Sequence, residues 1–479
     1  MYHAGLVVLL AHINIGLPYD PGDNGGPRLA WFFRFMVHDK PRKCQLIRSF
    51  RLELLKHDGY TMQRLLEGNI VDQVASILAC CSNLQALALP DCEAWMQCDA
   101  IPRALNALTN LHELKFLLTE GPKNKTIQFL SDLELPKLER LFLLRHHRFY
   151  VDDLGCPLVI AHQCRTTLRV LQFPPCELQL VDSVYPMLKT FILEFMHINT
   201  AHISTITSNL VQSLPNLEHL LLGTLTQGRG HGRYNAEPAG SVTPRMGFIH
   251  QNNRKEQYKL RMWPRLDILG GNVYALYLFA IACPVRYLQL QGELLVPQEM
   301  VMLREILDCC RPSSLKVDIE LGQEGFKVHH LQMLIPEECA RGISQLVVDF
   351  NFPIVPDSNL VIIMENIYAL LQLMPLTFLH ISLYRRLKWQ LGKKFRSDST
   401  SGYKVKVHAL DPDVVAYEIA KRVPTLQYLT LIRPWTEHNQ SWEIHRGEHG
   451  PNLIQKPPLF VYKLDEFGMG DVRASYYSA

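Results

Sequence analysis

The stretch that decides the fold is "CCSNLQALALPDC", which runs from Cys80 to Cys92. Its cysteines, together with Cys98, first suggest a metal site or a disulfide. Zinc sites favour C-x2–4-C pairs combined with a second pair or with histidines, and these cysteines do not have that spacing. The residues between them read L-x-x-L-x-L, which indicates a repeating strand instead.

The L-x-x-L-x-L pattern recurs along the chain at regular distances. In the first half, the runs begin at Leu84, Leu111, Leu138, Leu168, Leu188 and Leu217. In the second half, they begin at Val285, Ile343, Leu376 and Leu426. The first set is spaced by about 20–30 residues, which is close to the period of leucine-rich repeats. One such unit cannot bury its leucines alone, whereas stacked units can.

The segments between the runs have the features of helices. The segment from Pro297 to Cys310 begins with a proline and an early acidic residue, as helix starts prefer. Similar helices are predicted at Thr61 to Cys81, Ser358 to Met374 and Asp411 to Val423. We therefore predict an α/β fold, a leucine-rich-repeat solenoid. It would be a curved horseshoe with parallel strands on the concave face and helices outside.

The repeats also define the domain organisation. We predict an irregular N-terminal segment at residues 1–27, a repeat domain at 28–465 and a C-terminal tail at 466–479. Two polar stretches, 223–259 and 385–406, coincide with oversized repeat spacings. We expect both to be mobile loops inserted into single repeats, since such long connections are unusual within compact repeats.

The remaining chemical motifs favour structural roles. Cys92 and Cys176 both fall three residues after a strand run, at the N/C position of the repeat, and Cys80–Cys81 closes a helix. We therefore predict structural thiols. "HRGEH" (His445 to His449) matches a metalloprotease motif that requires a helix, but Gly447 disfavours a helix, so a solvated loop is predicted. We predict no catalytic residue, no metal site and no cofactor.

Composition and charge restrict the classes of partner. The chain has 479 residues, 47% of them hydrophobic, and a net charge of +3. Its pI of about 8.2 is too mild for nucleic-acid binding. The apolar start from Gly5 to Leu17 lacks the basic residue and the cleavage site of a signal peptide. The run from Val273 to Val285 is shorter than the ~18 residues of a membrane span. We expect no membrane contact, reduced cysteines and a cytoplasmic or nuclear location.

A candidate binding surface follows from the alternation of side chains along a strand. The residues two and four positions after the first leucine point away from the leucine core. Aromatic residues and arginine dominate binding energy at protein interfaces. The candidates for a partner site are therefore Arg140, Phe142, Tyr287, Phe378 and Tyr428. As an alternative, the apolar members are simply covered by the inserted loops.

The phrases "CSNLQALALPDC", "LTNLHELKF", "LPKLERLFL" and "LPNLEHLLL", with the opening segment from Phe32 to Leu54, resemble fungal F-box/leucine-rich-repeat proteins. The resemblance covers residues 28 to 465 and implies a ubiquitin-ligase adaptor that binds a Skp-type linker protein through its F-box. An F-box usually opens with Leu-Pro before an amphipathic helix. Here Leu17–Pro18 runs into "YDPGDNGG", which does not favour a helix, so no F-box is recognised.

The sequence therefore predicts a non-enzymatic protein-interaction module, in which a concave repeat surface binds a protein partner. An F-box-type adaptor role in a ubiquitin ligase is the more specific version of this prediction. Two alternatives come from other classes of protein. One is a hydrolase or metal-dependent enzyme that uses the His-rich C-terminal region, and the other is a secreted repeat receptor.

Overall fold

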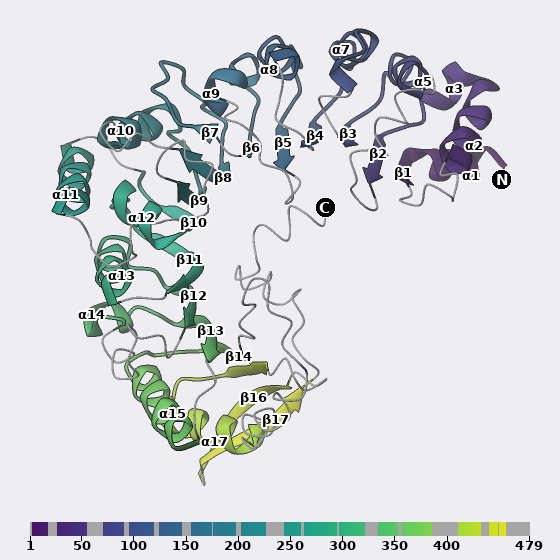
Figure 1. The fold of residues 1–479 in the computed structure, drawn as a ribbon. Coiled ribbons are helices and arrows are strands. Elements are labelled where there is room, and N and C mark those ends of the chain that lie inside the picture. Colours follow the sequence, from purple (N-terminus) through teal and green to yellow (C-terminus); the bar gives the residue numbers. More distant parts are fainter. Residues whose placement is uncertain are drawn as a thin grey trace, which may run out of the picture. The chain divides into compact units, whose positions relative to one another are not determined.

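The computed structural model describes the greater part of the chain (Figure 1). The described residues are 2–17, 26–54, 70–90, 95–118, 124–145, 155–174, 176–197, 203–226, 244–259, 263–294, 297–320, 334–352, 357–385, 411–432, 440–448 and 450–456. The chain divides into two compact units, Met1–Gly228 and Arg229–Ala479. Both units consist of strands that alternate with helices, which confirms the predicted α/β class.

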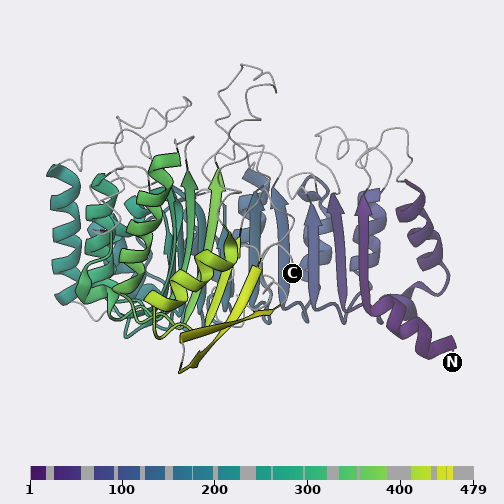
Figure 2. The same ribbon diagram turned by 90° about the horizontal axis from the view of Figure 1, so that it is seen from below.

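The first unit is a parallel sheet built in chain order. Its strands are β1 (His12–Leu17), β2 (Ser49–Leu54), β3 (Ala86–Pro90), β4 (Glu113–Leu118), β5 (Arg140–Arg145), β6 (Val170–Phe173), β8 (Thr190–His197) and β9 (His219–Thr226). Each pairs in parallel with the next, and the short β7 (Cys176–Glu177) also pairs with β8. The parallel direction of these strands is visible in Figure 2.

Helices connect the strands of the first unit. They are α1 (Tyr2–Ala11), α2 (Gly26–Val37), α3 (Lys40–Cys44), α5 (Ile70–Leu78), α7 (Ala100–Asn106), α8 (Asn124–Ser131), α9 (Pro157–Ile160), the 3₁₀ turn η1 (His162–Cys164) and α10 (Ile203–Ser213). From α5 to α10, the helices lie on one face of the strands (Figure 1). Parallel neighbours require such crossover connections, because a tight turn cannot return the chain to the same end of the sheet.

The second unit repeats this arrangement and ends in a hairpin. Its parallel strands are β10 (Leu266–Gly271), β11 (Val285–Leu294), β12 (Ser314–Glu320), β13 (Gln345–Phe352), β14 (Phe378–Arg385) and β15 (Tyr428–Ile432). The antiparallel strands β16 (Gln440–Gly447) and β17 (Gly450–Lys456) follow. Its helices are α11 (Pro244–Lys259), α12 (Val273–Phe279), α13 (Pro297–Cys310), α14 (Glu337–Ala340), α15 (Asp357–Gln372) and α17 (Pro412–Arg422).

The periodic apolar residues form the core, as the repeat pattern predicts. In the run that leads into β4, Leu111, Leu114 and Phe116 are each 0% exposed. In the next run, Leu138 and Leu141 are 0% and 1% exposed. Because side chains alternate across a strand, the leucine positions of every run face the same layer of helices. Burying a leucine contributes about 1.5–3 kcal/mol, so each added repeat stabilises its neighbours.

Asparagines join the turns of neighbouring repeats in the first unit. The residue before the first leucine of three runs is Asn83, Asn110 or Asn216. Their Nδ2 groups donate to backbone oxygens of the preceding repeat, those of Gln45, Ser82 and Pro186, at 2.8 Å in each case. These carbonyls lie in turns, where no strand partner is available, so the asparagines satisfy groups that would otherwise lack a protein partner.

The N-terminal segment corrects the sequence prediction. Residues 1–27 were expected to be irregular, but they contain α1, β1 and the start of α2. Strand β1 pairs with β2 over its whole length, from His12 with Ser49 to Leu17 with Leu54. Within the apolar segment, Leu10 and Ile15 are buried, at 4% and 9% exposure, whereas Val8 and Leu9 are 75% and 73% exposed.

The first predicted insertion, residues 223–259, is also corrected at both ends. Strand β9 continues to Thr226, and α11 occupies Pro244–Lys259. This helix packs through a polar stripe, because His250, Asn253 and Gln257 are each at most 2% exposed. The stripe contacts the last backbone carbonyls of α12: His250 Nδ1 lies 2.6 Å from the Tyr277 oxygen, Asn253 donates to Leu278, and Gln257 Nε2 donates to Phe279 at 2.7 Å.

Carbonyls in the last turn of a helix have no partner within that helix, so the side chains of α11 supply the missing donors to α12. Gln257 also accepts a hydrogen bond from the backbone N–H of Ala282 at 3.1 Å, just beyond the end of α12. The interaction needs no apolar stripe, which explains why a search for apolar periodicity assigns this segment to a loop.

Several predictions concern residues outside the described part of the chain. They are the Cys92 position, residues 386–406 of the second insertion and the tail at 466–479. The side chain of Cys176 is likewise not described, although its backbone belongs to β7. These predictions therefore remain predictions.

Two adjacent residues of β5 test the assignment of the core. Replacing Leu141 with Ala should lower the free energy of unfolding by about 2–5 kcal/mol, because it leaves a cavity beneath the helices. Replacing the neighbouring Arg140 with Ala should cost about 1 kcal/mol or less, because Arg140 lies on the opposite face and is solvated. Urea unfolding of both variants measures the difference. Equal losses would show that the two faces are wrongly assigned.

Candidate protein-binding surface

The strand face opposite the helices carries two rows of side chains in the first unit. The register places Ser49, Ala86, Glu113, Arg140, Val170, Thr190 and His219 side by side. Two residues further along the strands lie Arg51, Ala88, Lys115, Phe142, Gln172, Ile192 and Leu221. We call this surface the helix-free face.

Exposure on the helix-free face changes along the first unit. The side chains of Arg140 and Arg51 are 51% and 30% exposed. Two strands or more further on, Ile192 and Leu221 are 0% exposed. Phe142 of β5 is also buried, whereas Val170 and His219 further on stay partly exposed. Over β2 to β5, the accessible part of the face is mainly polar and includes Arg51, Glu113 and Arg140.

The accessible part is organised around Glu113. Its Oε2 atom lies 3.2 Å from Arg140 Nε, and its Oε1 atom lies 3.7 Å from Arg51 Nη2. The carboxylate thus stands between two guanidinium groups, that of Arg140 on the adjacent strand β5 and that of Arg51 on β2, two strands away across β3. Lys115 follows Glu113 on the same strand face. We call Arg51, Glu113, Lys115 and Arg140 the charged cluster. It contains three cationic groups and one anionic group, so it carries an excess of positive charge.

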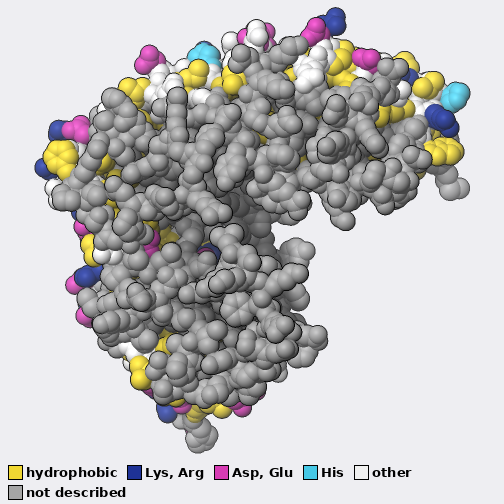
Figure 3. All heavy atoms as spheres, viewed as in Figure 1, with side chains coloured by type: hydrophobic (Ala, Val, Ile, Leu, Met, Phe, Trp, Pro, Cys, Tyr) yellow, Lys and Arg dark blue, Asp and Glu magenta, His cyan; other side chains and the backbone are white. Residues whose placement is uncertain are grey.

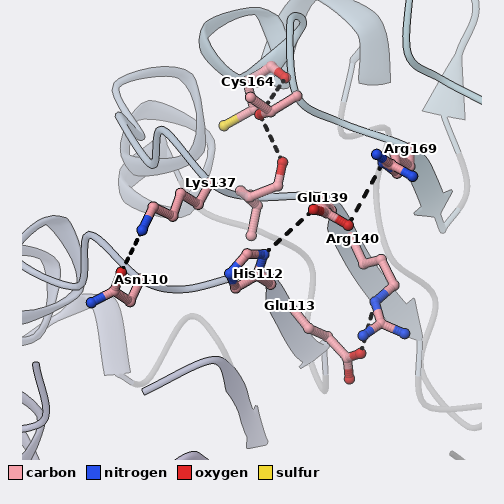
Figure 4. Close-up of polar contacts among 10 residues, drawn as sticks. Asn110, His112, Glu113, Lys137, Glu139, Arg140, Cys164 and Arg169 are labelled. Atoms are coloured by element: carbon pink, nitrogen blue, oxygen red, sulfur yellow. Dashed lines mark hydrogen bonds and ion pairs between the residues drawn. The ribbon is translucent and has the colours of Figure 1, made fainter. Parts of the chain in front are cut away.

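A second line of charges runs along the edge where the strands begin (Figure 4). Glu139 lies 3.5 Å from His112 Nδ1 and 3.7 Å from Arg169 Nε. Lys189 pairs with Glu218 in the same manner further along. All these side chains are between 39% and 49% exposed. Exposed pairs of this kind contribute about 0–1 kcal/mol each, so this line of charges adds little to the free energy of unfolding.

The helix side of the molecule has a different character. On the side seen in Figure 3, described side chains of both charges are interspersed with hydrophobic ones over the helices. The exposed large hydrophobic residues of the helices occur singly, as at Val301 on α13, or in twos, as at Val361 and Ile362 on α15. Single exposed apolar residues are normal on a protein surface and do not indicate a binding site.

The five residues predicted for a partner site separate into two groups. Arg140 and Phe142 lie in the first unit, two positions apart on β5. Tyr287, Phe378 and Tyr428 begin or nearly begin their strands in the second unit and share one row of the sheet with Ser314 and Gln345. The alternation rule therefore orients all five correctly.

The five predicted residues also differ in how far their side chains are exposed. Phe142, Tyr287 and Phe378 are 6%, 0% and 2% exposed, so they are buried and not surface anchors. Arg140 is exposed and Tyr428 is partly exposed. The prediction of an exposed partner site is therefore wrong for Phe142, Tyr287 and Phe378. Their burial agrees with the alternative that such residues are covered. Among the described residues, Arg140 is the strongest of the five as a binding residue.

Sequence reasoning did not predict the burial of polar side chains on the corresponding face of the second unit. Gln289, His380 and Thr430, which alternation turns away from the leucine core, are at most 6% exposed. Ser441, which pairs with Thr430, is 0% exposed. His380 Nε2 lies 3.1 Å from Ser382 Oγ, and Nδ1 has no hydrogen-bond partner among the described residues. Burial lowers the pKa of His380 to about 4, whereas Asp349 raises that pKa and Lys316 lowers it by smaller amounts. The imidazole is therefore neutral near pH 7.

Ser183 and His162 are residue types that can act as a nucleophile and its general base, but their hydrogen bonds do not suit that chemistry. Ser183 Oγ lies 2.8 Å from His162 Nδ1, and Arg165 Nη1 lies 3.0 Å from His162 Nε2. Because a guanidinium only donates, Nε2 accepts and the proton of the neutral ring stays on Nδ1. Nδ1 therefore donates to Ser183 and cannot accept its proton, as a general base must.

The "HRGEH" segment is a strand and not the predicted loop. His445 and Gly447 belong to β16, which pairs with β17 in an antiparallel hairpin. Period-2 alternation does not place the two histidines of H-x-x-E-H as a helix would, and His449 lies outside the described residues. Within the described ranges, no group of three or more His, Cys, Asp or Glu residues is placed to hold a metal ion. None of the helices described is long and apolar enough to span a membrane.

Comparison with known proteins adds little to this description. No family model and no curated protein matches the chain. A crystal structure described as the complex of Rad7 and Elc1 in yeast aligns with 14% sequence identity and a TM-score of 0.35, over 77% of this chain and 88% of that chain. A likeness of this size does not establish a common fold or a common function.

The low pKa of His380 predicts a pH-dependent stability. In the unfolded chain the imidazole titrates near its ordinary value of about 6.5, so the unfolded state binds the proton more readily between pH 6.5 and about 4. Stability that is present above pH 6.5 should be lost as pH falls through this window, by up to about 3 kcal/mol. His380→Gln, which does not titrate, should lack this part of the loss. Denaturant unfolding at pH 7, 6, 5 and 4 tests this, and identical pH profiles would contradict it.

Proposed function

We propose that this chain is a leucine-rich-repeat protein that binds a protein partner through the charged cluster on the helix-free face of its first unit. In this proposal the repeats adopt the horseshoe curvature of that class, and the protein acts without catalysis. The supporting observation is the ion-paired set of Arg51, Glu113 and Arg140, which lies on one face of the parallel strands β2, β4 and β5.

The backbone supports the cluster as a rigid platform. In each turn that precedes a strand, one carbonyl accepts two backbone N–H groups from the next repeat. Gln85 accepts from His112 and Glu113 at 2.8 and 2.9 Å, and His112 accepts from Glu139 and Arg140 at 2.9 Å each. The Cα positions of Glu113 and Arg140 are thus fixed before a partner arrives. Preorganisation of this kind reduces the entropy that binding costs.

The charges of the cluster favour a partner with an acidic segment. An incoming carboxylate can replace Glu113 as the partner of one arginine, in a bidentate geometry that guanidinium groups favour. The excess of cations over the single carboxylate would also accelerate association at low salt. Arginine is one of the residue types that dominate the energetics of protein interfaces.

An adaptor role in a ubiquitin ligase is the more specific version of this proposal. It rests on the resemblance of the repeats to fungal F-box/leucine-rich-repeat proteins, which implies a cytoplasmic or nuclear protein with a Skp-type linker as a second partner. The charged cluster would then be the surface that selects the substrate protein.

Charge reversal tests the binding surface. Protein captured from cells with the wild-type chain should bind Arg140→Glu at least about 10-fold more weakly in a purified assay, because the new carboxylate stands beside Glu113 and repels an acidic partner. Arg304→Glu is the matched control, since Arg304 is exposed on α13 in the second unit. The affinity should also fall with rising salt. Equal affinity of the two variants would exclude the charged cluster as the binding surface.

A separate experiment tests the adaptor role. Co-expression of the chain with a Skp-type linker protein should yield a complex that survives size-exclusion chromatography if an F-box function is present. The Arg140→Glu variant should form this complex normally, since the charged cluster is assigned to the substrate. Failure of wild type to form the complex would remove the ubiquitin-ligase version and leave the binding surface to be judged by the first experiment.

A further inference from the structure

Cys44 and Cys81 occupy the same position in neighbouring repeats of the first unit. Each lies five residues before a paired strand residue, Cys44 before Ser49 and Cys81 before Ala86. Each sits in the same local turn, because its carbonyl accepts the backbone N–H of the residue three positions later. These bonds are Ile47 to Cys44 at 3.2 Å and Leu84 to Cys81 at 3.0 Å.

This equivalence brings the two thiols together. Neighbouring parallel strands are about 4.8 Å apart, and disulfides join residues whose Cα atoms are about 4.4–6.8 Å apart. The turns themselves are joined by the hydrogen bond from Asn83 to the Gln45 carbonyl at 2.8 Å. The side chains of Cys44 and Cys81 are hydrogen-bonded to each other, and both are almost fully buried, at 0% and 1% exposure.

The two thiols differ in acidity. The hydrogen bond from Cys81 lowers the pKa of Cys44, burial opposes this, and the charge of Lys40 and a hydrogen bond from Cys80 lower it further. The pKa of Cys81 is raised by the same hydrogen bond and by burial. Cys44 is therefore the better thiolate, and Cys81 keeps its proton. Cys80, which precedes Cys81, is partly exposed.

The second unit contains two cysteines on neighbouring repeats that serve for comparison. Cys283 and Cys310 each lie five residues before paired strand residues, Leu288 and Leu315. Here burial raises the pKa of both thiols, that of Cys283 to about 12. Cys310 donates to the Ile281 carbonyl at 3.3 Å and not to a second sulfur. The pKa is lowered only at Cys44 of these four thiols.

We propose that Cys44 and Cys81 form a thiol–disulfide site that is oxidised by hydrogen peroxide. The Cys44 thiolate attacks one peroxide oxygen, the O–O bond breaks, and hydroxide leaves. Cys81 is still a thiol at this stage. Cys44 is then a sulfenic acid. Cys81 loses its proton and attacks the Cys44 sulfur, the S–S bond forms, and a second hydroxide leaves. In total, two thiols and one peroxide give one disulfide and two waters.

The disulfide would join α3 to the turn after α5. It would close the chain between residues 44 and 81, so the oxidised form would have a more restricted unfolded state. Reduction by a small dithiol or by glutathione would restore both thiols.

Peptide mapping of the purified full chain tests the proposal. After brief treatment with hydrogen peroxide, the chain is denatured, its free thiols are alkylated and it is cut with trypsin. The sequence places Cys44 in the tryptic peptide 44–48 and Cys81 in the peptide 65–103. These two peptides should appear joined by a disulfide that a reductant cleaves, while Cys283 and Cys310 should be recovered as alkylated thiols. The oxidised chain should also have a Tm several degrees higher than the reduced chain.

Because the peptide 65–103 also contains Cys80, Cys92 and Cys98, a variant with these three changed to Ser identifies the partner. The joined peptides should persist in this variant and disappear when Cys81→Ala is added. Full alkylation of Cys44 and Cys81 in the peroxide-treated wild-type chain would overturn the proposal, as would oxidation of Cys44 to the sulfinic or sulfonic acid without a disulfide. A Cys283–Cys310 disulfide formed equally fast would show that the environment of Cys44 confers no special reactivity, and would also overturn it.

Discussion

The structure depends on the burial of leucines that no single repeat can cover. A strand of five to eight residues presents its leucines to one helix, and their remaining surface is covered only when the next strand and helix stack alongside. The exposure of at most 1% at Leu111, Leu114 and Leu138 shows how complete this cover is within the first unit. Since apolar burial is the main favourable contribution to folding, each repeat is stable only because its neighbours are present.

Stacking has a second consequence, because it places equivalent residues side by side. An asparagine before the first leucine becomes a line of turn-to-turn hydrogen bonds, as in Asn83 and Asn110. A carboxylate and an arginine at one repeat position become an ion pair, as at Glu113 and Arg140. Two cysteines at one position become a hydrogen-bonded thiol pair, as at Cys44 and Cys81. Side chains that are distant in the sequence are thus neighbours in space wherever they share a repeat position.

The parts of the fold that follow this period could be predicted from the sequence. The strands that begin near Leu84, Leu111 and Leu138 and the helices α13, α15 and α17 lie where the pattern indicates. The parts that do not follow it could not be predicted. Helix α11 is held by His250, Asn253 and Gln257, which bind carbonyls of α12 and not an apolar surface. Strand β1 has a recognisable apolar sequence, but it pairs with β2 before the regular period begins.

For the candidate site, the sequence predicts which face of the strand each side chain lies on, but not whether that side chain is exposed. Alternation along a strand assigns Phe142 and Tyr287 to the face opposite the leucines, yet it cannot say that both are buried there. Exposure depends on segments whose position the period does not determine. The same reasoning explains why His380 was missed: its repeat position is that of a surface residue, and only its surroundings make it a buried, neutral imidazole.

Adjacent residues in a strand therefore serve separate purposes. Leu141 is buried under the helices, whereas Arg140 is half-exposed on the other face and contacts Glu113 of the neighbouring repeat. A change on the helix-free face alters contacts with the repeats on either side but leaves the leucine layer intact. The binding surface of such a protein can consequently diverge in sequence while the fold is retained. This physical independence of the two faces allows repeat proteins of one fold to recognise unrelated partners.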